Sequence, residues 1–425
     1  MIDQVQQAGS PHGNVRFNTV VNIFDGVFFG AALGFASFIT IIPLFVSQLT
    51  DSAILIGLVP AIHVVGWQLP QLLTSSRIQR LPRYKPMVLA MTVNERLPFL
   101  GLALLAWLLP GMARSTALTI TFLLLIWQGL GGGLTATVWQ LMIGKIIPVS
   151  WRGGFFGAQS AAANLLASIT AVAAGWTLEH FNSPLDFTLC FLLAGVSMAV
   201  SFGFLASTRE VDHVPSRTSS SSSELWKDVR RILASDAPFR RFVLIRAIFQ
   251  LGMVAFSFYA VYAVKELGAS AGLAGWLTGV LIFADTLANP LFGAIGDRKG
   301  HRLVILIGAI IALLSSALAG WLTTIPAWFL IFALAGAATV VGWTTAMVLS
   351  LEFGTPADQA TYVGLSNTLI APATLAAPFL AGWCIETLGY VAMFRSAALI
   401  FLVAALLSYR MVRHHAQALH SPQLD

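Results

Sequence analysis

The chain contains two copies of one segment, at residues 155–181 and 362–388, which align without a gap 207 positions apart. The shared positions are Phe155 with Tyr362, Gly157 with Gly364, Ala174-Gly175-Trp176 with Ala381-Gly382-Trp383, Glu179 with Glu386, and Phe181 with Leu388. Each copy is an apolar run of helix length that ends in an acidic residue. Because the chain is 57% hydrophobic and only 10% charged, this duplication predicts two similar membrane bundles joined in tandem, an arrangement typical of solute transporters.

Apolar runs long enough to cross a bilayer recur along the whole chain. About 20 apolar residues span the hydrocarbon core, and spans without water to satisfy the backbone must be helices. The alternating period of a β-barrel strand is absent. The sequence therefore predicts an all-α polytopic membrane protein in which twelve transmembrane helices form two pseudo-symmetric six-helix bundles. The expected spans are 20–46, 53–76, 87–109, 115–143, 155–178, 186–207, 239–264, 271–296, 303–323, 326–351, 361–385 and 390–411.

A polar segment separates the two predicted bundles. It contains Thr218 followed by five serines, a composition typical of a flexible linker. After the serines, Leu225, Trp226, Val229, Ile232 and Leu233 fall on one helical face, which favours a helix lying on the anionic inner leaflet; a partner-binding helix is the alternative. The predicted organisation is a cytoplasmic tail (1–19), an N-terminal bundle (20–207), a cytoplasmic linker (208–238), a C-terminal bundle (239–411) and a cytoplasmic tail (412–425).

The basic residues predict the orientation, since lysine and arginine accumulate in cytoplasmic loops. With both termini cytoplasmic, the cytoplasmic segments carry 19 of the 24 Lys and Arg, and the outer loops carry only Arg114 and Lys265. The net charge of +6 is therefore interpreted as a topology signal and not as a nucleic-acid footprint. We expect a multi-pass, monomeric protein of the cell membrane whose polar N-terminus is no cleaved signal. Cys190 and Cys384 lie inside apolar spans, so no disulfide framework or zinc site is expected.

The loop after the eighth span reads Gly-Ala-Ile-Gly-Asp-Arg-Lys-Gly-His-Arg at 293–302. With the six-plus-six layout and the duplication, it resembles the signature loop of the major facilitator superfamily, and the resemblance covers essentially the whole chain. Glycines allow a tight turn and close helix approach, and Asp297 can face the N-terminal end of a neighbouring helix. The resemblance implies a gating loop that latches the two halves in one state; a loop that is only topogenic is the alternative. The implied gating residues are Gly293, Gly296, Asp297, Arg298, Gly300 and Arg302.

Two features depart from the family pattern. The equivalent first-half loop, 77–86, keeps its basic charge but lacks the aspartate and the glycines. The fifth span lacks the glycine-proline signature of many drug–proton antiporters, while Pro372 and Pro378 lie in the eleventh span.

Ionisable residues inside the predicted spans indicate where function lies. The set is Asp25, His63, Glu95, Arg96, Arg246, Asp285 and Arg395. A charge at the bilayer centre costs about 2.5–3.5 kcal/mol, so these groups must pair, reach water or bind something. Asp25 and Arg246 lie at similar depths, and we hypothesise a salt bridge made in one state and broken in the other, or else a static pair. Glu95 and Arg96 point about 100° apart on a helix and are interpreted, like Arg395, as ties to neighbouring helices.

Four of these residues are candidates for proton coupling: Asp285, His63, Asp25 and Glu95. Asp285 is the strongest, because desolvation disfavours a charged carboxylate and lets it exchange a proton near neutral pH. His63 could share that proton, or it could be a packing residue.

Polar stripes on several spans predict a hydrated cavity between the halves. By the family resemblance, spans one, two, four, five, seven, eight, ten and eleven line it. The candidates for contact with the solute are Arg246, Gln250, Trp67, Gln68, Gln128, Trp139, Asn164, Asn289, Trp343 and Asn367. Amides beside flat aromatic rings suit a sugar, and they suit an amphipathic drug equally well.

These features predict a secondary active transporter that moves a small organic solute by alternating access, coupled to a proton gradient and leaning to export. It needs no cofactor and no metal. Uptake of a sugar-like or other small solute, proton-coupled or facilitative, is the first alternative, and a non-transporting solute sensor is the second. An enzyme is not expected, because the sequence contains no ligand spacing, nucleophile motif or phosphate loop. The expected partners are the small-molecule solute and the lipid bilayer, without nucleic acid.

Overall fold

The computed structural model describes residues 11–78, 82–211, 230–350, 352–353 and 359–420. Within these ranges every regular element is helical. Ten helical segments are long and apolar enough to cross a membrane, and Ala53–Gln68 and Ile325–Val340 are shorter apolar helices. The predicted all-α polytopic fold is confirmed, and the described helices agree with twelve crossings.

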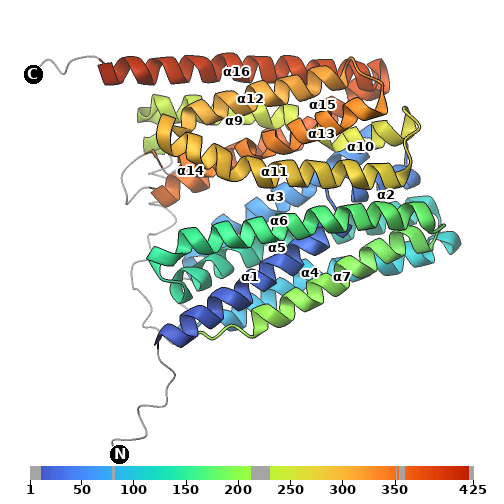
Figure 1. The fold of residues 1–425 in the computed structure, drawn as a ribbon, viewed down its shortest axis with the longest axis horizontal. Helices are drawn as coiled ribbons and strands as arrows, with labels where there is room; N and C mark the ends of the chain where they lie inside the picture. The colour runs from blue at the N-terminus through green and yellow to red at the C-terminus, as the bar shows by residue number, and fades with distance from the viewer. Residues whose placement is uncertain (1–10, 79–81, 212–229, 351, 354–358, 421–425) are drawn as a thin grey trace, which may run out of the picture.

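The crossings form two halves that lie one above the other in Figure 1. The N-terminal half comprises α1 (Pro11–Phe35), α2 (Ile41–Leu49), α3 (Ala53–Ile78), α4 (Lys85–Leu108), the 3₁₀ turn η1 (Leu109–Gly111), α5 (Arg114–Ile146), α6 (Val149–His180) and α7 (Leu185–Ala206). The C-terminal half comprises α9 (Ala237–Met253), α10 (Phe256–Lys265), α11 (Ala271–Lys299), α12 (His301–Ala319), α13 (Ile325–Val340), the π-helical segment η2 (Val341–Thr345), α14 (Ala346–Ser350), α15 (Gln359–Leu388) and α16 (Tyr390–His420).

The first and seventh crossings are interrupted at corresponding places. Between α1 and α2 the backbone N–H of Ile39 donates to the Ser37 hydroxyl at 3.3 Å. Between α9 and α10 the backbone hydrogen bonds join residues three apart and not four, as in the bond from the Ser257 N–H to the Val254 carbonyl at 3.2 Å. The predicted spans 20–46 and 239–264 are therefore each built from two helices and not one.

The duplicated segments form α6 and α15, and each packs against the opposite half. A Cβ placed on Gly175 of α6 would lie 2.6 Å from the Gly275 Cα of α11. A Cβ placed on Gly382 of α15 would lie 2.6 Å from the backbone nitrogen of Ile54 of α3. The repeated glycine thus allows close backbone contact in two seams, α6–α11 and α3–α15, that join the halves. Beside the glycines, Trp176 and Trp383 are exposed on the outer surface.

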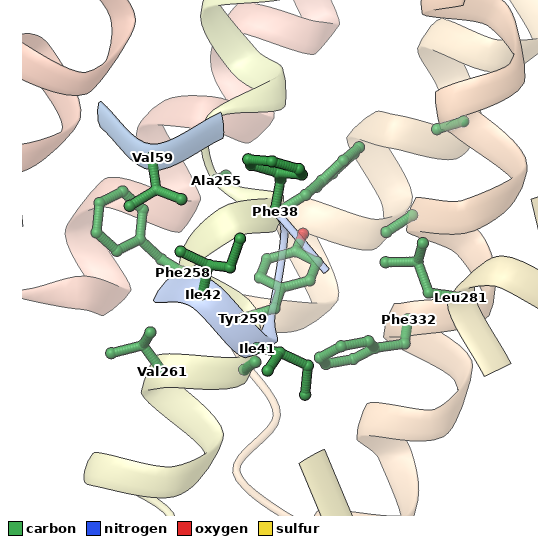
Figure 2. Packing of buried hydrophobic residues seen from close by; sticks show 14 of the residues in the cluster. Phe38, Ile41, Ile42, Val59, Ala255, Phe258, Tyr259, Val261, Leu281 and Phe332 are labelled. Carbon is green, nitrogen blue, oxygen red and sulfur yellow. The ribbon is translucent and has the colours of Figure 1, made fainter. Parts of the chain in front are cut away.

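An apolar cluster closes the molecule at the right-hand end of Figure 1. Figure 2 shows Ile41 and Ile42 of α2 lying with Phe258 and Tyr259 of α10, all four fully buried. At this end the Lys265 ammonium also lies 3.0 Å from the Asp51 carboxylate, across the two halves. Toward the other end, where α1 begins and α16 ends, α6 and α11 diverge (Figure 1).

The N-terminal half extends beyond its predicted boundary at residue 207. The Glu210 carboxylate accepts hydrogen bonds from the backbone N–H groups of Tyr84 (2.9 Å) and Lys85 (2.7 Å) and from Lys145 Nζ (2.8 Å). Glu210 therefore caps the N-terminus of α4, where a negative charge is stabilising. Its charge and the burial of the ring both raise the pKa of the Tyr84 phenol, burial having the larger effect.

Several predicted boundaries also move. Helix α6 begins at Val149, six residues before the expected start, and α16 continues to His420, nine residues past the expected end. Both cysteines are free and buried, as expected.

Candidate functional site

A cavity of about 350 Å³ lies between the two halves. Its wall is formed by residues of α1, α3, α6, α9, α10, α11, α13 and α15, together with the two helix interruptions. Of the 24 lining residues, sixteen are glycine, alanine, proline or larger apolar residues. The eight polar ones are Ser37, His63, Asn164, Gln250, Ser257, Asp285, Thr339 and Thr374. The cavity is thus mainly apolar, with a few polar groups.

Asp285 lies in the cavity wall and connects the two halves. Its Oδ1 accepts hydrogen bonds from Asn289 Nδ2 at 2.8 Å and from Asn164 Nδ2 of α6 at 3.2 Å, and its Oδ2 accepts from Thr339 Oγ1 at 2.9 Å. Among the residues that the structure describes, no basic side chain forms a salt bridge with it. In this part of the chain, the Asp285 carboxylate is stabilised by hydrogen bonds from neutral side chains and not by an opposite charge.

His63 lies in the wall contributed by the N-terminal half. Its ring stacks on Phe38 with centroids 3.9 Å apart, and its Nδ1 lies 2.9 Å from Gln128 Oε1. This pair places an imidazole at the cavity surface with an amide directly behind it.

Asp25 lies outside the cavity wall and pairs with a different arginine from the one predicted. Arg96 Nη2 of α4 lies 3.0 Å from Asp25 Oδ1, and the Ser201 hydroxyl of α7 donates to the same oxygen at 2.6 Å. The alternative of a static Asp25–Arg246 pair is wrong, since each of the two has other partners here, whereas a salt bridge made in another state stays a prediction. Similar depth did not bring the two together, because Asp25 faces the interior of its own half.

Arg96 also approaches its neighbour Glu95. Its Nη1 lies 3.9 Å from Glu95 Oε2. Although the two side chains leave the helix about 100° apart, which predicts that they do not pair, the long Arg96 side chain folds back, so that prediction is wrong. Glu95 is buried beside Gly132 of α5, where a Cβ would lie 3.0 Å from Glu95 Oε1. These charges form a buried network within the N-terminal half. Arg395, by contrast, is exposed and donates to the Gly320 carbonyl at 3.2 Å.

Arg246 is buried between α9 and α15. Its Nη1 donates to Ser366 Oγ at 2.8 Å, and both Nη atoms lie 3.2 Å from Asn367 Oδ1. Gln250, one turn further along α9, lines the central cavity.

The predicted solute-contacting residues lie in different places relative to the cavity. Asn164 and Gln250 line the cavity, while Gln128, Asn289 and Asn367 lie behind it, bonded to His63, Asp285 and Arg246. Gln68 is buried, and Trp67 lies beside Gly132 within the N-terminal half. Trp139 packs edge-on against Phe156 with centroids 6.2 Å apart. The side chain of Trp343 lies outside the described residues.

The loop at 293–302 is a tight turn between α11 and α12. Gly300 has φ +89°, a backbone conformation that favours glycine. A Cβ on Gly296 would lie 2.6 Å from His301 Nε2 and would force that side chain to move. Nothing lies within 4 Å of a Cβ on Gly293, so the steric reason expected there does not hold in this conformation. The Asp297 side chain is 79% exposed, 3.9 Å from His301. Arg298 is exposed, and the Arg302 guanidinium lies 6.0 Å from the Phe353 ring centre.

Part of the predicted linker helix can be placed. Residues 212–229, which include Leu225, Trp226 and Val229, lie outside the described residues. Ile232 is buried in the main apolar cluster and Leu233 packs against that cluster. These two residues therefore contact protein, and the expectation that they face lipid is wrong. In the first-half loop, residues 79–81 are likewise outside the described part.

The sequence profile of the Major Facilitator Superfamily matches residues 26–264 and 242–424, essentially the whole chain. The chain belongs to the Major Facilitator Superfamily. It is a multi-pass membrane transporter and not an enzyme. The resemblance expected from the loop and the duplication is confirmed.

Solved structures share this superfamily fold at low sequence identity. A point mutant of the nucleoside transporter NupG superimposes with a TM-score of 0.72 at 11% identity, over 93% of this chain and 99% of that one. A D-xylose-proton symporter gives 0.70 at 18% identity, over 94% and 97%. At these identities the likeness establishes the fold alone.

A curated relative matches a smaller part of the chain. The multidrug transporter protein MdtP of Bacillus subtilis (strain 168) is 25% identical over 115 residues, which cover 27% of this chain and 21% of MdtP. The match thus spans about a fifth of that protein.

Several residues that line the cavity between the halves were not predicted from the sequence. They are Ser37, Phe38, Thr339 and Thr374, together with the apolar residues around them. Thr339 is an isolated hydroxyl in an apolar run, and Phe38 reaches the wall because the helix is interrupted there. The Thr339 hydroxyl could have been noticed in the sequence, because it stands alone in an apolar run. The helix interruption at Phe38 could not, because it leaves the hydropathy pattern unchanged.

Proposed function

We propose that this transporter moves a small, mainly apolar organic solute across the cell membrane by alternating access, and that Asp285 takes up and releases the coupling proton. The proton gradient is the energy source, and export is the favoured direction. The protein acts as a monomer.

The position of Asp285 is the observation that carries this proposal. Its carboxylate lies at the cavity surface and accepts a hydrogen bond from Asn164 of the other half at 3.2 Å. Hydrogen bonds to an ionised acceptor are roughly twice as strong as neutral ones. Protonation of Asp285 would therefore weaken the contact between the halves, and this would link proton uptake to the conformational change.

The chemistry of the cavity supports an amphipathic solute over a sugar. Sixteen of its 24 lining residues offer no side-chain hydrogen bond, whereas a sugar needs many polar partners. The local similarity to the multidrug transporter protein MdtP agrees with a drug-like solute. A sensor without transport is not favoured, because the superfamily match and the structural neighbours are transporters.

The orientation follows from the basic residues, which predict cytoplasmic termini. With that orientation, the end closed by α2 and α10 faces outward, and the conformation described here is open to the cytoplasm. In this state the Asp297 side chain is exposed, and its one ion pair among the described residues is with His301 at 3.9 Å. The loop at 293–302 is then expected to latch the halves in the opposite, outward-open state.

Replacement of Asp285 by asparagine tests the coupling. A thermal-shift screen of amphipathic compounds supplies a stabilising solute, and its flux is measured in proteoliposomes with and without a pH gradient. At one proton per solute, one pH unit supports roughly tenfold accumulation by the wild type. We expect Asp285→Asn to lose gradient-driven accumulation while solute exchange at equal pH persists. The control Asp186→Asn, at the start of α7, should accumulate solute like the wild type, and unchanged pH dependence in Asp285→Asn would refute the proposal.

A further inference from the structure

Arg246 carries a buried positive charge without a negative partner. It is 7% exposed, and its guanidinium donates to Ser366 and Asn367, both neutral. Within the described part of the chain, its Nε donates to no acceptor and no carboxylate lies within 4.0 Å. Arginine does not lose its proton in proteins, so the charge is permanent.

Arg96 shows what a structural arginine looks like in the same protein. It is also 7% exposed, but it has Asp25 at 3.0 Å and Glu95 at 3.9 Å. A buried charge without a partner is strongly destabilising. The equal burial and unequal neutralisation of the two arginines indicate that no residue of the described part of the chain supplies the counter-charge of Arg246, and that a bound anion is a candidate for it.

The surroundings of Arg246 connect it to the central cavity. A small recess beside it, of about 10 Å³, is bounded by Ile245, Phe249, Val341 and Gly342. Gln250 lines both this recess and the cavity. The wall at Val341 and Gly342 belongs to the π-helical segment η2, a deviation that is frequent at functional sites. The recess has room for about one water molecule, which is also the size of one carboxylate oxygen.

We propose that Arg246 is the anion-binding subsite of the transporter, and that the transported solute is an amphipathic organic anion with one carboxylate. The apolar body would occupy the cavity, while one carboxylate oxygen enters the recess and accepts a hydrogen bond from the guanidinium. Arginine suits this role because its charge is permanent and its hydrogen bonds to a carboxylate are charge-assisted. This inference rests on the proposed function and narrows its solute class: an uncharged sugar or a cationic drug would leave the Arg246 charge without a negative partner.

A matched pair of probes tests the subsite without any transport measurement. Binding of 2-naphthoate and of the uncharged 2-naphthamide is measured by calorimetry on the purified full-length protein in detergent, without a pH gradient. The wild type should bind the carboxylate roughly tenfold or more tightly than the amide, the range of charge-assisted hydrogen bonds. Because no gradient is used, the result does not depend on Asp285 or on proton coupling.

Variants then assign the preference to Arg246. Arg246→Gln should bind both probes with equal affinity, Arg246→Lys should keep part of the preference, and Arg395→Gln should keep all of it. Naphthamide binding reports that a variant is folded; if Arg246→Gln binds no amide, Arg246→Lys decides, and an undiminished preference there counts against the subsite. Absent naphthoate binding or equal probe affinities in the wild type, or a preference that survives Arg246→Gln, would overturn the inference.

Discussion

The Asp25 carboxylate joins three helices of the N-terminal half through one guanidinium and one hydroxyl. Arg96 reaches it from α4 and Ser201 from α7, and Arg96 Nη2 also donates to Ser201 at 2.9 Å. The Asp25 and Arg96 side chains are 7% and 8% exposed. Because neither charge meets bulk solvent, Asp25 depends on Arg96 for neutralisation, and Arg96 depends on Asp25 together with Glu95 at 3.9 Å.

Removal of one member should therefore cost more than removal of both. We expect Arg96→Gln to lower the free energy of unfolding by about 3–5 kcal/mol, because it leaves a buried carboxylate unpaired. Asp25→Asn combined with Arg96→Gln should recover much of that loss. The measurement is denaturant unfolding in detergent, with the exposed Arg395→Gln as control. A double variant as unstable as the sum of the single variants would contradict the pairing.

At the residue level, the sequence predicted depth better than direction. Asp285, His63, Asn164 and Gln250 were chosen for depth and polarity, and all four line the cavity. Depth gave no information on which way Asp25 faces, because the angle around the bundle depends on the packing of α1 against α4 and α7. The choice of Arg96 over Arg246 is a property of the assembled half.

At the level of elements, the duplicated segments show why their glycines recur. Gly175 and Gly382 lie at the two seams between the halves, where backbones approach too closely for a side chain. The sequence predicted both helices and their equivalence. It did not predict that α6 packs on α11 and α15 on α3, because a repeated segment shows that two helices are equivalent and not which helices they contact.

A methyl group in one seam should force the closed end apart. A Cβ on Gly275 would overlap Gly175 Cα, whereas a Cβ on Gly293 of the same helix meets nothing within 4 Å. We expect Gly275→Ala to lengthen the distance between spin labels at Asn182 and Thr323, two exposed loop positions at that end. Gly293→Ala should leave the distance unchanged. An unaltered distance in Gly275→Ala would show that the seam absorbs the methyl group.

The whole molecule was predictable because the bilayer imposes strong constraints. Hydropathy identified the crossings, and the duplication with the loop at 293–302 identified the superfamily. The interruptions in the first and seventh crossings were missed. They depend on local hydrogen bonds, such as the one that the Ile39 N–H donates to the Ser37 hydroxyl, and these do not change the apolar pattern. The capping of α4 by Glu210 was missed for a similar reason: it joins residues 125 positions apart.

The orientation of the whole molecule can be tested by thiol labelling. Cys190 and Cys384 are buried, so the native background should be low. A membrane-impermeant maleimide should label Asn182→Cys in intact cells and Asp297→Cys only after permeabilisation. Both positions are exposed and lie at opposite ends of the bundle. Labelling of Asp297→Cys in intact cells would reverse the topology.

The short helices α2 and α10 have a consequence for how the closed end yields. Each follows an interruption, and the two pack against one another across the halves. Because an interruption separates α2 from α1 and α10 from α9, we expect each short helix to change its tilt while both glycine seams stay intact. We therefore expect release in two stages, in which a narrow passage first admits water and ions and full separation of the halves then lets the cargo leave.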